Sequence, residues 1–300
     1  MDTRRALLVD AFTADPLAGN PAGVVPDAAG LASEQMRAIA RELSVSETAF
    51  LTRTESAADR RVRYFTPREE VDLCGHATVA CFAHLYADGA LDAGSYGLET
   101  NVGVLDVEIT PEGVVWLTGN APSVDPVDLD YRRAGAALGI DPAALEDVGA
   151  DLPPAVASIG LPALVIPVNF LEHLGSASPD AEAVAELAEE HGAAGVYAFT
   201  FDALSADSTL HARFFAPGVG VREDPVTGTA AGACGAYLRH VGALDPTPEE
   251  MRFEQGHFVD RPGVVKVGVG ESVRVGGRAV TALDGTIAVP DVEADDIIEA

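Results

Sequence analysis

The stretch "EDPVTGTAAGAC", residues 223–234, leads from two carboxylates through a Thr-Gly-Thr turn into a run of small apolar residues. The earlier stretch "VDLCGHATVAC", residues 71–81, has the same order of acidic approach, glycine and small apolar run. The glycines Gly75 and Gly228 stand 153 residues apart, and so do Cys81 and Cys234. We interpret the two stretches as the starts of two equivalent helices.

The similarity extends to both sides of these stretches. The matched pairs are "RYFTP" (63–67) with "RFFAP" (213–217), "TAFL" (48–51) with "YAFTF" (197–201), and "LETNVGVLDVEI" (98–109) with "FEQGHFVDRPGVVKVGV" (253–269). Internal similarity at a long, nearly constant offset indicates a duplicated structural unit. A chain of 300 residues is also comfortable for two domains of ordinary size.

Local patterns predict what each copy contains. Residues 6–12, 47–52 and 61–66 read as strands, whereas residues 31–44 carry apolar side chains at helical spacing. Residues 75–87 contain no Asp, Glu, Lys or Arg, so a helix there must be enclosed by protein.

We therefore predict an α+β fold of two pseudo-symmetric domains, each a curled mixed β-sheet around a central apolar helix. Residues 1–122 are expected to form the first half, joined by the C-terminal residues 284–300, and residues 123–283 the second. The link is expected somewhere in the acidic, Pro-containing stretch 120–132.

The charge of the chain limits its partners. The formal net charge is -28, from 47 acidic and 19 basic residues, and Lys266 is the one lysine. A field of this sign repels nucleic acid and anionic lipid, so neither is an expected partner. The acidic residues are spread along the chain, and lysine is almost absent. This composition is typical of a protein that stays solvated in concentrated salt, so a salt-loving host is expected.

No apolar run approaches the roughly 20 residues of a membrane span, and the N-terminal apolar run is too short for a signal peptide. The cysteines Cys74, Cys81 and Cys234 are odd in number and lie among apolar residues or glycine, which argues against a disulfide framework. A cytoplasmic location is expected.

The sequence lacks the motifs of several common nucleotide-binding, hydrolase and zinc sites. "PVTGTAAG" has neither the lysine of a phosphate-binding loop nor the glycine spacing of a dinucleotide site, and no G-x-S-x-G elbow occurs. Cys74, His76 and Cys81 do not have structural zinc spacing, and Thr229 replaces the histidine in the second copy. We expect no metal and no cofactor.

The two helix starts predict an anion site, because unsatisfied N–H groups and the helix dipole both favour negative charge there. If the two starts face each other across a cleft, a small carboxylate is the natural ligand. The dipole disfavours a charged imidazolium at His76, which is expected as a neutral hydrogen-bond partner of the substrate or as an ordinary helix-start histidine. Asp224 either holds its turn or contacts substrate, and Thr229 is open to the same two interpretations.

The two copies differ at one position that could carry a catalytic acid/base. Glu47 in "SVSETAF" aligns with about Val196 in "GVYAFTF", so only the first copy offers a carboxylate. Beside apolar Ala49 and Phe50, Glu47 would suit general acid/base catalysis near neutral pH. Alternatively it caps a strand or pairs with an arginine. Arg63 and Arg213, placed identically in both copies, are interpreted as structural.

The motifs together resemble one known family. "VDAFTADPLAGNPAGVV", "ARELSVSETAFL", "RYFTPREEVDLCGHATVA" and "RFFAPGVGVREDPVTGTAAGA" look like the PhzF family of phenazine-biosynthesis-like isomerases, which share a duplicated fold with diaminopimelate epimerase. The motifs follow the family's order over nearly the whole chain.

The resemblance implies a cofactor-free and metal-free isomerase, usually a homodimer, that moves a proton between carbons of a small carboxylate-containing molecule. By the family's pattern Glu47 is the acid/base, and His76, Asp224 and Thr229 complete the catalytic set. Thr229 departs from the phenazine enzyme, which has serine there. The expected substrate-binding residues are Gly75, Gly228, Asn20 and Cys74.

Two alternatives stay open. The epimerase relatives use two cysteines, and Cys74 occupies the first thiol's position, but "DPVTGT" has no thiol at the second. An amino-acid epimerase or racemase would depend on Cys74. A metabolite-binding protein without turnover is the third interpretation, because a fold does not determine a function.

Overall fold

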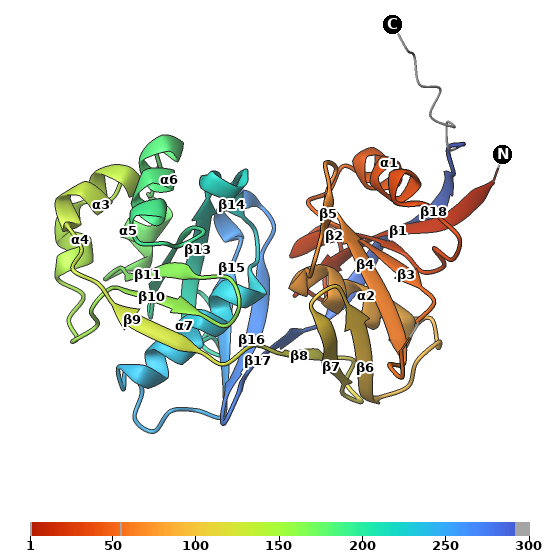
Figure 1. The fold of residues 1–300 in the computed structure, drawn as a ribbon. Coiled ribbons are helices and arrows are strands. Elements are labelled where there is room, and N and C mark those ends of the chain that lie inside the picture. The colour runs from red at the N-terminus through yellow and green to blue at the C-terminus, as the bar shows by residue number, and fades with distance from the viewer. Residues whose placement is uncertain (1, 55, 292–300) are drawn as a thin grey trace, which may run out of the picture. The chain divides into compact units, whose positions relative to one another are not determined.

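The structure is a computed structural model that describes residues 2–54 and 56–291. Its contacts divide these residues into two compact units (Figure 1). The first unit comprises residues 2–17, 21–115 and 278–291, and the second comprises residues 18–20 and 116–277. The sequence predicted the boundaries at 122/123 and 283/284, and the part of that prediction covering 292–300 lies outside the described residues.

The first unit surrounds the apolar helix α2 (Gly75–Ala87) with strands. The helix contacts β1 (Thr3–Ala11), β3 (Thr48–Thr52), β7 (Gly103–Ile109) and β18 (Ala279–Ala288). The other strands are β2 (Asn20–Val25), β4 (Arg60–Phe65), β5 (Glu70–Val71), β6 (Gly94–Thr100) and β8 (Val115–Thr118), of which β2 and β8 lie at the crossovers between the units. Most of α2 is buried, because no face of it carries charge.

Helix α1 (Ser33–Leu43) covers the outer face of this sheet. Its buried residues Met36, Ile39 and Ala40 pack toward β3 and β4, and its charged residues face solvent. Apolar residues three and four apart lie on one face of a helix, which explains why this segment is amphipathic. The helix ends at Ser44 in a left-handed conformation.

The second unit repeats this arrangement around helix α7 (Gly228–His240). The helix contacts β9 (Ser123–Pro126), β10 (Ala155–Ser158), β11 (Ala163–Pro167), β16 (Gly263–Val269) and β17 (Val273–Gly277). The remaining strands are β12 (Val196–Thr200), β13 (Leu210–Ala216), β14 (Val221–Asp224) and β15 (Glu250–Gln255).

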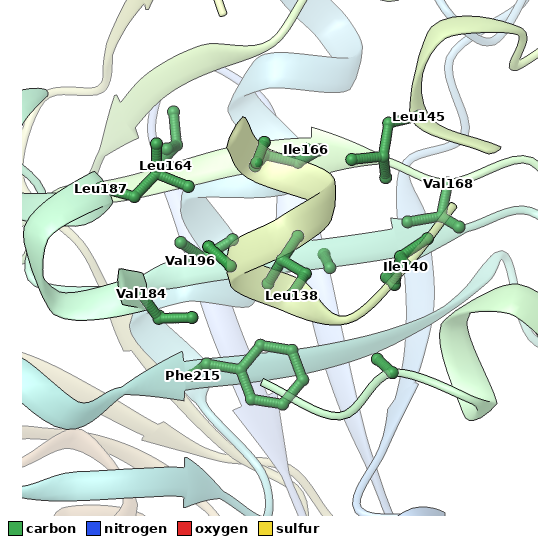
Figure 2. Packing of buried hydrophobic residues seen from close by; sticks show 14 of the residues in the cluster. Leu138, Ile140, Leu145, Leu164, Ile166, Val168, Val184, Leu187, Val196 and Phe215 are labelled. Carbon is green, nitrogen blue, oxygen red and sulfur yellow. The ribbon is translucent and has the colours of Figure 1, made fainter. Parts of the chain in front are cut away.

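An outer layer of helices packs on this second sheet. It consists of α3 (Tyr131–Leu138), α4 (Pro142–Glu146), α5 (Leu171–Gly175) and α6 (Ala181–Glu190), with short 3-10 turns η1 (Pro217–Val219) and η2 (His257–Val259) nearby in the unit. Figure 2 shows how Leu138 of α3 and Val184 of α6 meet Leu164, Val196 and Phe215 of the strands. The outer helices and the sheet thus share one apolar core.

Strand registers show the duplication directly. Thr48 pairs with Phe65 in the antiparallel β3–β4 ladder, and Val196 pairs with Phe215 in the β12–β13 ladder. In each copy the second of these strands then pairs in parallel with the next long strand, β4 with β6 and β13 with β15. The two units therefore share topology as well as sequence motifs.

The arginines that match between the copies have the same structural role. Arg63 donates from Nε and Nη2 to Glu70 at 2.8 and 2.6 Å, and Arg213 donates from Nε and Nη2 to Glu223 at 2.8 and 2.7 Å. Each guanidinium also lies over the phenylalanine two residues later, at 5.1 and 4.9 Å from the ring centre. The structure thus supports the interpretation of both arginines as structural.

Among the residues that the structure describes, no helix is both long enough and apolar enough to cross a membrane.

Candidate active site

The start of α2 offers unsatisfied backbone donors. Cys74, in extended conformation, precedes the helix, and its carbonyl accepts both the Thr78 N–H at 3.0 Å and the Thr78 hydroxyl at 2.7 Å. The first-turn N–H groups have no acceptor within the helix, and no side chain caps them. A Cβ built on Gly75 would meet no atom within 4 Å. An anionic group therefore has room to approach these amides.

Three reactive side chains meet beside this helix start. Oε2 of Glu47 lies 3.5 Å from Nε2 of His76, and Sγ of Cys74 lies 3.3 Å from Nδ1 of the same ring. The Ser46 hydroxyl also lies 3.5 Å from His76 Nε2. The Glu47 and His76 side chains are 24% and 12% exposed, so both are partly sheltered but reachable.

Glu47 is positioned by the backbone, because it is the last residue of the loop before β3. Its carbonyl accepts the Gly23 N–H at 3.0 Å, which fixes the backbone at the edge of the sheet. Of the two structural alternatives from the sequence, pairing with an arginine is not what the described residues show: the basic side chain against the Glu47 carboxylate there is His76, at 3.5 Å.

The register corrects the alignment between the copies. The Leu164 N–H donates to the Gly195 carbonyl at 2.9 Å, the bond that corresponds to the one on Glu47. Glu47 is therefore equivalent to Gly195, one residue before the Val196 that the sequence comparison suggested. The comparison was off by one because the motif "TAFL" tolerates a shift that a β-ladder does not.

The second copy has no space for a side chain at this position. A Cβ on Gly195 would lie 2.5 Å from the Phe215 carbonyl oxygen and 2.8 Å from the Ala216 Cβ. Such contacts are closer than packed atoms allow, and one of them is to backbone, which cannot move aside cheaply. The carboxylate of Glu47 is thus a feature of the first copy alone.

The second unit has its own polar cluster at the start of α7. The Asp224 carboxylate accepts from Asn20 Nδ2 at 2.9 Å and from the Thr227 hydroxyl. Asn20 also donates to the Val226 carbonyl at 2.8 Å, and the buried amide of Gln255 donates to the Asp224 carbonyl at 2.8 Å. Asp224 is therefore held in one orientation by side chains that are themselves buried.

Thr229 is the second-copy counterpart of His76. It lies in the first turn of α7 and is partly exposed, whereas Gly228 before it is buried. No side chain caps this helix start either. The structure thus places Thr229, Gly228, Asp224 and Asn20 at one helix start of the second unit, and Glu47, Cys74, Gly75 and His76 at one helix start of the first.

Sequence reasoning missed three members of these clusters, Ser46, Thr227 and Gln255. Thr227 could have been found, because it stands 153 residues after Cys74 and so occupies the position of the second thiol. Ser46 and Gln255 carry no such signal, since their contacts arise only from the folding of distant segments.

The side chains of Glu47, Cys74 and His76 could also be considered as ligands of a metal ion. Donor atoms of Glu47, Cys74 and His76, which the sequence assigned to one site, lie within 4.8 Å of one another. However, the thiol lies closest to Nδ1 of the imidazole and the carboxylate to Nε2, so they approach different nitrogens of the ring. One imidazole nitrogen binds one ion, so this arrangement suits hydrogen bonding and proton transfer better than chelation.

A sequence model of phenazine biosynthesis-like proteins (PhzC-PhzF) matches residues 9–285. The chain belongs to this family. Among similar relatives, the isomerase YfhB of Bacillus subtilis is 37% identical over 293 residues, covering 95% of this chain and 96% of the relative. An isomerase of Deinococcus radiodurans is 38% identical and covers 92% of each chain. Both are described as uncharacterized isomerases, and this PhzF-family chain is an enzyme of the isomerase class.

Solved structures agree with the fold. The PhzF-family protein of Bacillus anthracis has a TM-score of 0.88 at 31% identity, covering 96% of this chain and all (100%) of that one. A hydroxyproline epimerase from Agrobacterium vitis, with bound trans-4-OH-L-proline, has a TM-score of 0.56 at 15% identity, which supports the fold alone. The predicted α+β fold with a duplicated, epimerase-like architecture is confirmed.

Proposed function

We propose that this PhzF-family isomerase moves a proton between two carbons of a small carboxylate-containing metabolite, with Glu47 as the single acid/base. The observation that carries the proposal is the asymmetry of the duplication. Glu47 lies beside His76 at an uncapped helix start, while Gly195 leaves no space for a second carboxylate. One group that both removes and returns a proton suits relocation of that proton on one face of a substrate.

The reaction balances without a further reagent. The Glu47 carboxylate takes a proton from a carbon next to an unsaturated or carbonyl group, and the electron pair of the broken C–H bond moves into that π system. The Glu47 carboxylic acid then returns the proton to another carbon of the same system. The N–H groups at the helix start hold the substrate carboxylate and stabilise charge that develops during transfer.

The second unit offers polar groups of its own at the start of α7. Asp224, oriented by Asn20 and Thr227, would accept a hydrogen bond from a substrate N–H or O–H group, and Thr229 would offer a hydroxyl. In this view Gly228 contributes a backbone donor at the start of α7, as Gly75 does at α2.

A second candidate, an amino-acid epimerase, is favoured by one contact. The Cys74 thiol lies 3.3 Å from His76 Nδ1, close enough for the ring to take its proton. The equivalent residue of the second copy is Thr227, whose hydroxyl already donates to Asp224. Inversion needs a proton donor on each face of the carbon, and Thr227 does not replace a thiol in that role.

Deuterium incorporation separates these functions. The protein is incubated in D2O with candidate unsaturated carboxylates and amino acids, and NMR and chiral chromatography follow label position and configuration. The proposal expects deuterium at a new carbon, a rate reduced by at least about a thousandfold in Glu47→Gln, and little change in the control Glu42→Gln on the exposed face of α1.

The other outcomes contradict the proposal. Inversion at one carbon that is lost in Cys74→Ser, but kept in the buried control Cys81→Ser, would establish the epimerase. Saturable binding of a candidate without any deuterium exchange would contradict proton transfer to that ligand by Glu47.

A further inference from the structure

Two buried hydroxyl groups lie behind the start of α2. Tyr64 of β4 and Thr78 in the first turn of α2 are both 0% exposed, and their hydroxyl oxygens lie 2.6 Å apart. The Thr78 hydroxyl oxygen also lies 2.7 Å from the carbonyl oxygen of Cys74. Both distances are typical of O–H···O hydrogen bonds. The three groups therefore form one chain of hydrogen bonds, which runs from the sheet to the residue that precedes the helix.

The chemistry of the groups sets the direction of donation in this chain. The Cys74 carbonyl can only accept, so the single hydroxyl proton of Thr78 is used for that bond. Tyr64 must then donate its own proton to the Thr78 oxygen. Burial raises the pKa of Tyr64 well above its usual value near 10, so the phenol keeps the proton that it donates.

The chain acts on the peptide bond between Cys74 and Gly75. The Cys74 carbonyl accepts the Thr78 N–H at 3.0 Å as well as the Thr78 hydroxyl, so both of its lone pairs are used. In a planar trans peptide the N–H points opposite to the C=O. Because the carbonyl points into α2, the Gly75 N–H points out of the helix start. Hydrogen bonds to the carbonyl also polarise the peptide and make its N–H a stronger donor.

Gly75 gives this peptide little rigidity of its own. A Cβ at this position would meet no atom within 4 Å, so packing does not hold the residue, and glycine has the freest backbone of all residues. The orientation of the Gly75 N–H therefore depends on the hydrogen bonds that fix the carbonyl before it.

The second copy lacks both hydroxyl groups. In the matched motifs "RYF" and "RFF", Phe214 stands in place of Tyr64, and Ala231 stands in place of Thr78 at the 153-residue offset of the two helices. Ala231 keeps the backbone bond to the residue before its helix, at 3.0 Å. A threonine hydroxyl that donates to the carbonyl four residues earlier is common in helices. The buried tyrosine behind it, and the exchange of both residues together, point to a function beyond helix formation.

A different side chain holds the helix start in the second copy. Gln255 accepts the Thr227 N–H at 3.2 Å and donates to the Thr227 hydroxyl at 3.1 Å. The parallel ladders make Thr100 the first-copy equivalent of Gln255, and the Thr100 hydroxyl donates to the Gly103 carbonyl at 2.9 Å instead. Each copy therefore has its own means of fixing the residue before its central helix.

We propose that Tyr64 and Thr78 are positioning residues for the substrate carboxylate, because through the Cys74 carbonyl they aim and strengthen the N–H of Gly75. The inference rests on the proposed function, which places a carboxylate at this helix start. It gives a role to two fully buried side chains that lie outside the cluster of Glu47, Cys74 and His76.

NMR titration of the 15N-labelled full chain with crotonate, a small unsaturated carboxylate, tests the inference at constant ionic strength set with NaCl. The Gly75 amide proton should move to lower field as crotonate binds, while the uncharged crotonamide should have little effect. Tyr64→Phe/Thr78→Val removes both hydroxyl groups with little change in volume, and the Cys74 carbonyl keeps its backbone donor. This double variant should weaken the crotonate affinity measured at Gly75 at least about fivefold, since one hydrogen bond to the peptide is lost.

Three further variants separate the hydroxyl groups from packing. Thr78→Ser keeps a hydroxyl and should retain the wild-type affinity. Tyr197→Phe, which removes a buried tyrosine hydroxyl from the second unit, should also retain it. Tyr64→Phe alone breaks only the outer bond of the chain and should weaken the affinity about twofold. It serves as the test variant if the spectrum shows that the double variant is unfolded.

Three results would overturn the inference. They are wild-type affinity in the variants that lack the Tyr64 hydroxyl, an equal loss of affinity in Thr78→Ser, and no response of the Gly75 amide up to about 50 mM crotonate, too weak for a substrate site. Deuterium exchange does not enter these measurements, so failure of the positioning role and failure of proton transfer by Glu47 are observed separately. In the exchange assay the double variant should raise KM more than it lowers kcat, whereas Glu47→Gln should lower kcat.

Discussion

Gly75 in the first copy and Gly195 in the second are glycines for different reasons. A Cβ on Gly75, at the start of α2, would meet no atom within 4 Å, whereas a Cβ on Gly195 would lie 2.5 Å from the Phe215 carbonyl oxygen. The first glycine is not required by packing within the described chain, so its small size has a different cause, which we assign to the approach of a ligand.

Alanine substitutions should separate the two cases. Gly195→Ala should lower the free energy of unfolding by about 1–3 kcal/mol or more, since its methyl group has no space. Gly75→Ala should leave stability unchanged or raise it by about 0.5–1 kcal/mol, because alanine favours the helix, yet it should raise the KM for the substrate. Urea unfolding and steady-state kinetics check both. Unchanged kinetics in Gly75→Ala would argue against substrate binding at this helix start.

At the scale of residues, a motif is informative where it marks a backbone position. Glu47, His76, Asp224 and Thr229 lie at or next to helix or strand ends, as their motifs predicted, while their roles in catalysis stay predictions. Gln255 was not, because its contacts with the Asp224 and Thr227 segment come from a strand 28 residues further along the chain, so nothing local marks it.

At the scale of elements, the repeated Arg–Glu pairs differ in burial. Arg213 and Glu223 side chains are 7% and 14% exposed, against 20% and 27% for Arg63 and Glu70. Arg213 also donates from Nη1 to two carbonyls at the end of α5, at 3.1 Å each. It therefore joins the outer helical layer to the sheet.

Removal of each arginine should reflect this difference. Arg213→Met should destabilise the protein by about 3 kcal/mol, since it leaves a buried carboxylate and two carbonyls without their donor. Arg63→Met should cost about 1 kcal/mol, because water reaches its partners. Chemical denaturation of both variants measures the contrast, and equal losses would mean that burial does not set the strength of the pair.

A second repeated pair contributes to the pH dependence of stability. Glu99 pairs with Arg61 in the first copy, and the equivalent Glu254 accepts from Nδ1 of the buried His211 at 3.0 Å. Burial lowers the pKa of His211, although the bond to Glu254 opposes the shift. Burial alone would raise the pKa of Glu254, but hydrogen bonds from the Leu204 and Ser205 segment and from His211 outweigh it and lower that pKa.

Both shifts predict loss of stability in acid. His211 takes up a proton near pH 6.5 when unfolded but only at lower pH when folded, so protons favour the unfolded chain below about pH 6.5. The stabilisation from Glu254 is present above its unfolded pKa near 4.5 and is lost as the pH falls through its lower folded value. His211→Gln should flatten the decline in melting temperature between pH 7 and about 5. If the melting temperature of His211→Gln falls with pH as steeply as that of the wild type, other groups cause the decline.

Prediction of elements succeeded for the strongest patterns. The charge-free segment 75–87 is found as α2 with the same bounds. Within the stretch 120–132, Ser123–Pro126 form β9 and pair with β10, which shows that an acidic, Pro-containing strand can resemble a linker in composition.

At the scale of the whole molecule, the net charge of -28 sets a dependence on salt. Repulsion among the carboxylates opposes the compact state, and ions shorten its range from about 10 Å at 0.1 M to about 3 Å at 1 M. The midpoint of thermal unfolding should therefore rise steadily as NaCl increases over this range. Calorimetry in matched buffers checks this, with sucrose as the uncharged control, and a flat or falling midpoint would contradict the expected adaptation to salt.

The duplicated fold could be predicted because each copy repeats its motifs at a nearly constant offset. The paths by which the chain crosses between the units could not, since residues 18–20 join the second unit without any change in composition. Strand order depends on long-range pairing, which is invisible in a single sequence.

The pairing of β1 with β18, from Thr3 opposite Ala288 to Ala11 opposite Ala279, has a consequence for synthesis on the ribosome. The first unit to be translated is the last to be completed, because its opening strand has no partner on that edge until residues 279–288 leave the exit tunnel. The second unit has all its strands once Gly277 has emerged. The carboxylate of Glu47 is made early, but the sheet that supports it closes only after residues 279–288 have emerged, later than every strand of the second unit.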